Sequence, residues 1–190
     1  AHQRSNAALA LALAKNAPGA LGGAVAASAA AGLAAARWPG RLEVLRAGAG
    51  EAPEVLCDAA HNGEGAAALA DWLAAHPQRR AVLFGVVQGK RAEDMLGPLR
   101  HAESVILCRP PSPRGREPAE LLPLVAGLPQ VHCVAGPVAE ALALAERCTP
   151  AGGQLVVYGS IFLLAEVRRL LLGEPADSDV STAPTQDPLR

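Results

Sequence analysis

The sequence predicts an α/β fold, in which a mostly parallel six-stranded sheet carries helices on both faces. Short apolar runs rich in Val, Leu and Ile mostly lack strict alternation, which is typical of strands covered on both sides. From residue 54 onward these runs alternate with helical stretches, as right-handed crossovers between parallel strands require. The predicted strands are 42–46, 54–57, 81–87, 104–108, 131–134 and 154–158.

The first two predicted strands are joined only by the short loop AGAGEAP, so we expect them to pair antiparallel and make the sheet mixed. Two alanine-rich helices, 2–15 and 20–36, come before them and end at the breakers NAPG and Pro39-Gly40. The polar, proline-bearing segment 174–190 lacks periodicity, and we expect it to be disordered. Further helices are predicted at 63–76, 91–100, 117–126, 137–147 and 160–172.

Composition excludes several classes of function. The 190 residues carry a net charge of −1 and no cluster of Lys or Arg, which argues against a nucleic-acid partner. No apolar stretch of about 18 residues is free of charges and turn formers, so we predict no transmembrane helix and no membrane partner. The four cysteines form no C-x-x-C pair, and we expect buried thiols in a reduced, cytoplasmic setting. No His/Cys/Asp set has the spacing of a zinc site.

Polar residues gather where the predicted strands end. Ligands of open α/β sheets sit beyond the carboxyl ends of the strands, so these groups predict one working edge. The groups are Asp58, His61 and Asn62 after the second strand, Gln88–Arg91 after the third, Arg109–Arg114 after the fourth and Tyr158–Ser160 after the sixth.

Each of these groups also has a purely structural interpretation. Asp58 or Asn62 would cap the helix 63–76, and Ser160 would cap the last helix. His61 would be an ordinary partly buried histidine, the loop with Lys90 and Arg91 would be solvated, and Arg109–Arg114 would be a rigid surface turn. The structural and functional interpretations are compatible, because a capped helix start also attracts anions.

Familiar phosphate and catalytic motifs are missing from the sequence. There is no G-x-x-x-x-G-K-[ST] loop, no G-x-G-x-x-G after a strand and no G-x-S-x-G elbow. The residues therefore amount to half a site, with donors and one carboxylate but no phosphate cradle and no metal shell.

At these residues the chain resembles the C-terminal part of folylpolyglutamate synthase/dihydrofolate synthase, a branch of the Mur ligase superfamily with a Rossmann-like C-terminal domain. The D-x-x-H-N element also recurs in cell-wall Mur ligases, whereas W-P-G-R-L-E, H-Q-x-x-N and G-S-x-F-L-x-x-E point to the folate branch. Gly63, Gly89 and Arg91 depart from the family pattern, which has proline, aspartate and aspartate there. The matching stretches, in order, are AHQRSNAALAL, WPGRLEVL, DAAHNGEG, FGVVQGKRAEDML and GSIFLLAEVRRLL.

The resemblance implies an ATP-dependent ligase. In that family ATP phosphorylates a carboxylate of dihydropteroate or of a tetrahydrofolate glutamyl tail, and the α-amine of L-glutamate then attacks the acyl phosphate. The Mg²⁺ ligands and the phosphate loop are expected in an N-terminal ATPase domain that is missing from this chain. The resemblance implies that Asn6 contacts adenine, Arg41 the ATP phosphates and Asp58 the ribose. It places the catalytic candidates His61 and Ser160 on the glutamate side, with Lys90 as an anion contact.

The resemblance also divides the chain. It implies that 1–36 are the end of the central ATPase domain and a linker, that 37–173 are the C-terminal domain and that 174–190 are a tail. Because the sequence opens without methionine, we expect a part of a longer protein that is inactive alone, and a monomer as in most of the family. The alternatives are the same domain of a cell-wall Mur ligase, against which Trp38–Arg41 argue, and a stand-alone α/β binding module.

Overall fold

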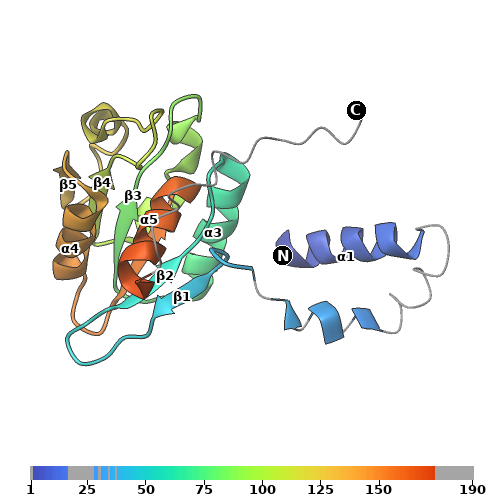
Figure 1. The fold of residues 1–190 in the computed structure, drawn as a ribbon. Coiled ribbons are helices and arrows are strands. Elements are labelled where there is room, and N and C mark those ends of the chain that lie inside the picture. Colours follow the sequence, from blue (N-terminus) through green and yellow to red (C-terminus); the bar gives the residue numbers. More distant parts are fainter. Residues whose placement is uncertain (1, 17–27, 30, 34, 37, 174–190) are drawn as a thin grey trace, which may run out of the picture.

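The structure, a computed structural model, describes residues 2–16, 28–29, 31–33, 35–36 and 38–173. Its centre is a six-stranded sheet in the order β1-β2-β6-β3-β4-β5 (Figure 1). β1 runs antiparallel to β2, and all other neighbours are parallel, which confirms the predicted mixed sheet. The strands are β1 (Glu43–Arg46), β2 (Glu54–Cys57), β3 (Arg80–Phe84), β4 (Ser104–Cys108), β5 (Val131–Val134) and β6 (Gln154–Tyr158).

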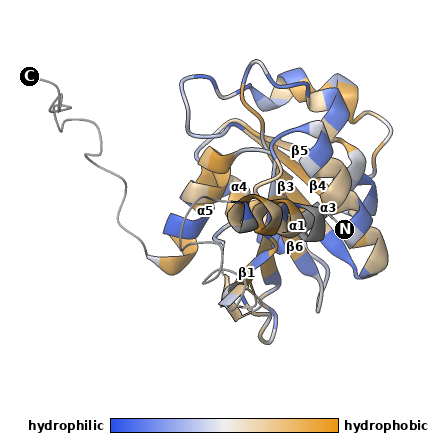
Figure 2. Ribbon diagram, turned by 90° about the vertical axis from the view of Figure 1, so that its right-hand side faces the viewer, coloured by the Kyte–Doolittle hydropathy of each residue, from blue (hydrophilic) through white to orange (hydrophobic). Residues whose placement is uncertain are grey.

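Helical elements cover both faces of the sheet, and alternate strand residues point into two separate cores. Leu56, Val82 and Val156 face the core under α3 (Gly63–Ala75) and three 3₁₀ turns. Leu83 and Leu155 face the opposite core under α4 (Val138–Cys148) and α5 (Ile161–Leu172). Figure 2 shows the strands in hydrophobic colours at the centre of this body. Burial on both sides explains why the strand sequences lack strict alternation.

Two predicted helices are wrong in type. The segment 91–100 forms two 3₁₀ turns, η1 (Ala92–Met95) and η2 (Gly97–His101), and 117–126 forms a third, η3 (Pro118–Leu124). Pro98 and Pro123 provide the reason, because proline has no backbone N–H to donate and clashes with the preceding helical turn. The buried side chains Met95, Leu99 and Leu121 still reach the core.

The amino-terminal segment lies beside the layers rather than within them (Figure 1). Helix α1 (His2–Lys15) forms as predicted, and its Leu9 and Leu13 are 61% and 67% exposed. Of the predicted helix 20–36, residues 28–29, 31–33 and 35 are described and helical. The predicted tail 174–190 lies outside the described residues. In the part of the chain that the structure describes, no helix has the length and apolarity to cross a membrane.

The cysteines divide by position in the sheet. Cys57 and Cys108 are buried as predicted, and burial is the chief cause that raises the pKa of each thiol to about 12. Cys133 is exposed, so the prediction of a buried thiol is wrong there. The reason is that β5 is the last strand of the sheet and is covered less completely than the strands inside it. Cys148, at the end of α4, is half-buried.

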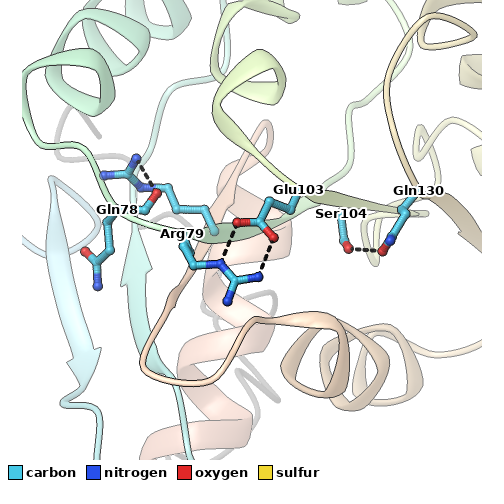
Figure 3. Close-up of polar contacts among 6 residues, drawn as sticks. Gln78, Arg79, Glu103, Ser104 and Gln130 are labelled. Atoms are coloured by element: carbon cyan, nitrogen blue, oxygen red, sulfur yellow. Dashed lines mark hydrogen bonds and ion pairs between the residues drawn. The ribbon is translucent and has the colours of Figure 1, made fainter.

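At the amino ends of the strands, polar side chains tie neighbouring strands together (Figure 3). Arg79 donates two hydrogen bonds of 2.8 Å to the carboxylate of Glu103. Ser104 Oγ donates to Gln130 Oε1 at 2.8 Å. These residues pair with each other and so give this edge a structural role, whereas the predicted site residues follow the opposite ends of the strands.

Candidate functional site: the carboxyl edge of the sheet

Three strand ends meet closely at the carboxyl edge, and Gly159 permits it. The N–H of Gly159, after β6, donates to the carbonyl of Ala60, after β2, at 2.9 Å. A Cβ on Gly159 would lie 2.5 Å from the carbonyl oxygen of Gly85, after β3. Side chains that follow β2, β6 and β3 therefore start from one compact edge, as the sequence predicts for Asp58 and Ser160.

Arg41 sits in an unusual stretch of backbone beside this edge. Trp38–Arg41 form a β-turn of type II, in which the Arg41 N–H donates to the Trp38 carbonyl at 3.2 Å and Gly40 has φ 75°. Leu42 also has a positive φ, 45°, which costs a residue with a side chain about 1–2 kcal/mol. Arg41 is thus held between two left-handed residues, a conformation that other contacts must stabilise.

Asp58 supplies one of those contacts. Its Oδ2 accepts the Leu42 N–H at 3.0 Å and its Oδ1 accepts the Ala60 N–H at 2.9 Å. The side chain is buried, and burial raises the pKa of the carboxyl even though these two bonds and the charge of Arg41 act to lower it. Asp58 therefore fastens the Arg41 turn to the end of β2. It does not cap α3, so that structural interpretation is wrong for Asp58.

The two other capping interpretations are confirmed. Asn62 Oδ1 accepts the Gly65 N–H at 2.8 Å and begins α3, and Ser160 Oγ accepts the Phe162 N–H at 3.2 Å and begins α5. Helices α3 and α5 therefore both direct their amino ends, which favour anions, toward this edge. Each capping oxygen accepts a backbone N–H group, so the first role of these two side chains is to begin their helices.

His61 is half-buried and its ring is oriented by the backbone. Nδ1 lies 2.9 Å from the carbonyl oxygen of Ala59. A carbonyl can only accept, so in the neutral ring the proton sits on Nδ1 and Nε2 keeps its lone pair. The imidazole is therefore set up as an acceptor or a base through Nε2.

A small hollow joins Arg41 to the start of α3. Its volume of about 70 Å³ is well below the roughly 300–1,000 Å³ of small-molecule pockets. The hollow can receive part of a ligand, such as one anionic group, but cannot enclose a nucleotide. Glu64, in the first turn of α3, lies in it too and was missed by the sequence reasoning. The lining residues are Arg41, Ala59, Ala60, His61, Asn62, Glu64 and Gly65.

Lys90 and Asn6 stand apart from the hollow. Lys90 is exposed on a loop that is joined to a second loop, because the Gln88 N–H donates to the Arg114 carbonyl at 2.7 Å. Lys90 and Arg114 therefore belong to one pair of loops that does not line the hollow. Asn6 is on α1, outside the layers of the sheet (Figure 1). Among the described residues, no group of three or more His, Cys, Asp or Glu could hold a metal ion.

The predicted rigid turn after β4 forms one side of an open groove. An ion pair of 2.9 Å between Arg109 and Glu117 fastens the start of the turn. The groove has a volume of about 520 Å³, and residues 135–138 at the start of α4 form its other side. Three prolines of the turn, Pro110, Pro111 and Pro113, line this groove.

Known proteins share much of this sequence. The family model of the Mur ligase glutamate ligase domain matches residues 40–161. A Halobacterium salinarum protein named "Probable bifunctional folylpolyglutamate synthase/dihydropteroate synthase" is 34% identical over 95% of this chain and 22% of its own length. A Mycobacterium tuberculosis "Dihydrofolate synthase/folylpolyglutamate synthase" is 43% identical over 51% of this chain and 20% of its own length.

A solved structure shares the fold as well. The structure of Mycobacterium tuberculosis folylpolyglutamate synthase complexed with ADP matches with a TM-score of 0.67 at 27% identity, over 78% of this chain and 36% of that one. The chain thus spans about a fifth of the length of the curated relatives described above and about a third of the solved structure. Because the family model covers well over half of its residues, the chain belongs to the Mur ligase glutamate ligase domain family.

Proposed function

We propose that the chain is the C-terminal domain of an ATP-dependent ligase that adds L-glutamate to dihydropteroate or to a tetrahydrofolate. The observation that carries the proposal is the hollow at the carboxyl edge, where Arg41 and His61 converge in a space too small for a nucleotide. Such a surface suits one wall of a cleft whose other wall is a separate domain. The names of the two curated relatives support the folate substrate over a cell-wall acceptor.

Arg41 has the chemistry for the first step. ATP transfers its γ-phosphoryl group to the substrate carboxylate, which gives an acyl phosphate and ADP. A guanidinium offers five donors in a fixed fork that fits phosphate oxygens. Placed beside the amino end of α3, it would stabilise the charge that develops on the transferred group.

The second step forms the amide bond. The amine of glutamate attacks the acyl carbon, the C–N bond forms, the C–O bond to phosphate breaks, and the amine loses a proton. We assign His61 to the glutamate side because its Nε2 keeps a lone pair that can accept a hydrogen bond or that proton. Ser160 belongs to the same side through the amino end of α5, which favours a carboxylate.

The structure gives Asp58, Asn6 and Lys90 less direct roles in nucleotide binding than the sequence suggests. Asp58 is 7% exposed and both of its oxygens accept backbone N–H groups, so its proposed ribose contact is secondary to holding the Arg41 turn. Asn6 would reach adenine, and Lys90 would contact an anion, only when a further domain lies against this edge.

The remaining assignments concern the longer protein. The described residues gather no metal cluster, and we propose that the Mg²⁺ ligands lie in the ATPase domain. We propose that 1–36 belong to the end of that domain and a linker, and 37–173 to the C-terminal domain. We also propose a cytoplasmic monomer.

The test uses the longest natural protein that carries this chain. ATP-dependent addition of glutamate is measured with dihydropteroate, with a tetrahydrofolate and with a UDP-muramoyl acceptor. We expect turnover with a folate acceptor only, and a loss of about 10²-fold or more in kcat/KM for ATP in Arg41→Ala. Arg114→Ala is the matched control, because that exposed arginine lies outside the hollow. Equal losses in the two variants would refute the role of Arg41, and turnover by the isolated chain would refute the half-site.

A further inference from the structure

Glu43 is a motif residue to which the site described above gives no role. It is the first residue of β1 and follows Arg41 by two positions in W-P-G-R-L-E. Its Oε2 accepts the N–H of Gly40 at 2.7 Å and pairs with Nη1 of Arg168 on α5. Arg168 comes from another matching stretch, GSIFLLAEVRRLL. One carboxylate thus joins the turn before β1 to the helix after β6.

The position of this carboxylate relates it to Arg41. Two residues with positive φ flank Arg41, and each has its N–H held by a carboxylate, Gly40 by Glu43 and Leu42 by Asp58. The turn also packs against α5, because a Cβ on Gly40 would lie 3.1 Å from Cδ2 of Leu164. Removing either carboxylate would take away one of the bonds that hold the three-residue segment carrying the guanidinium, although the Ala59 N–H would still donate to the Gly40 carbonyl.

The charges around Glu43 favour the ionised form. Burial raises the pKa of the Glu43 carboxyl, but the bonds from Arg168 and Gly40, together with the charge of Arg168, outweigh burial and hold that pKa below its usual range. Cys57 faces Glu43 across the β1–β2 pair, and its thiol, with a pKa of about 12, stays neutral. The Asp58 carboxylate follows Cys57, so Arg168 beside Glu43 and Arg41 beside Asp58 are the cations that balance this acidic corner.

We propose that Glu43 is a positioning residue for Arg41, and that with Arg168 it clamps the turn onto α5 so that the guanidinium stays over the hollow. The clamp itself follows from the contacts of this chain, and only its effect on catalysis rests on the proposed function. If Glu43 were merely structural, replacing it would lower the global stability of the chain without a local effect at the turn.

The first experiment uses the chain itself. Amide hydrogen exchange is followed by NMR in Glu43→Ala and in Glu166→Ala, a matched control whose carboxylate pairs with Arg169 on the same helix. The side chains of Glu43 and Glu166 are 27% and 26% exposed. We expect the Gly40 amide to exchange at least tenfold faster in Glu43→Ala alone, beyond any change at the core amide of Leu83. Equal changes at Gly40 and Leu83, or no change at Gly40, would overturn the clamp.

Two further measurements keep the result decisive. If Glu43→Ala does not fold, Glu43→Gln takes its place; it keeps an acceptor for Gly40 but loses the charge for Arg168, so the clamp predicts a smaller increase in exchange at Gly40 that still exceeds any change at Leu83. In the longer protein, kcat/KM for ATP should fall in Glu43→Ala. The double variant, Glu43→Ala with Arg41→Ala, should lose no more than Arg41→Ala alone. Additive losses would refute action through Arg41. A longer protein without ligase activity would refute the proposed function and leave the exchange result to decide the clamp.

Discussion

Replacing Gly159 by alanine tests how tightly the strand ends are packed at the carboxyl edge. Gly159 has φ 112°, and an added Cβ would lie 2.5 Å from the Gly85 carbonyl oxygen and 2.9 Å from the ring of Phe84. Neither partner can retreat easily, because Gly85 is itself pressed against the Cys108 carbonyl and Phe84 is fully buried. Two costs therefore add, one for backbone conformation and one for overpacking.

A matched glycine separates the two costs. Gly152 has φ 68° and nothing within 4 Å of an added Cβ, so Gly152→Ala should lose only the conformational part, about 1–2 kcal/mol. Gly159→Ala should lose a further 1–3 kcal/mol, roughly, because overpacking of a well-filled site typically costs that much. The total of about 2–5 kcal/mol is a large share of the stability of an ordinary domain.

Urea unfolding followed by circular dichroism measures both variants. We expect a lower midpoint at unchanged slope, which reports a change in stability rather than in the surface exposed on unfolding. NMR shifts in Gly159→Ala should also move at Asp58 and His61, since the Gly159 N–H holds the loop after β2 through the Ala60 carbonyl. If the two variants lost the same free energy within about 0.5 kcal/mol, the reasoning about close packing at this edge would be refuted.

Three further outcomes follow from the same contacts. Asn62→Ala should cost about 1 kcal/mol of unfolding free energy, because it removes the cap of α3; urea titration measures the loss. Folding lowers the pKa of Glu43, so its contribution to the unfolding free energy is present above its ordinary pKa of 4.5 and is lost as the pH falls through the folded pKa. The difference in unfolding free energy between the native chain and Glu43→Gln should therefore shrink below about pH 4.5. At pH 8 iodoacetamide should alkylate exposed Cys133 well before buried Cys57, which mass spectrometry of timed samples would detect, and labelling at equal rates would contradict the buried position.

The sheet could be predicted because its strands carry their own signal. The apolar runs ending at Cys57 and Tyr158 are buried on both faces, and the structure places both strands within a residue of the prediction. The helix predicted at 91–100 failed because tertiary burial keeps Met95 and Leu99 inside while Pro98 prevents a continuous helix. Apolar spacing alone does not separate these cases.

The sequence predicted the helix caps at this edge but not the long-range contacts that hold the Arg41 turn. Asn62 and Ser160 cap helices that begin within three residues of them, so local residue types suffice. Asp58 instead bonds Leu42, sixteen positions earlier, and Glu43 pairs with Arg168, 125 positions later. No local pattern contains those distances along the chain. The place of Glu43 in the motif W-P-G-R-L-E was the only available signal of its role, and its partner Arg168 is visible only in the fold.

The left-handed backbone at Leu42 makes this position a natural target for engineering. Glycine or asparagine adopts such a conformation with less strain, but Leu42 is only 36% exposed, so replacement also gives up part of its packing. Leu42→Gly would then relieve an intrinsic penalty while loosening the arm that presents Arg41. Where the relief of strain exceeds the lost packing, selection for heat resistance would retain Leu42→Gly and selection for turnover would reject it, so stability and activity compete at position 42.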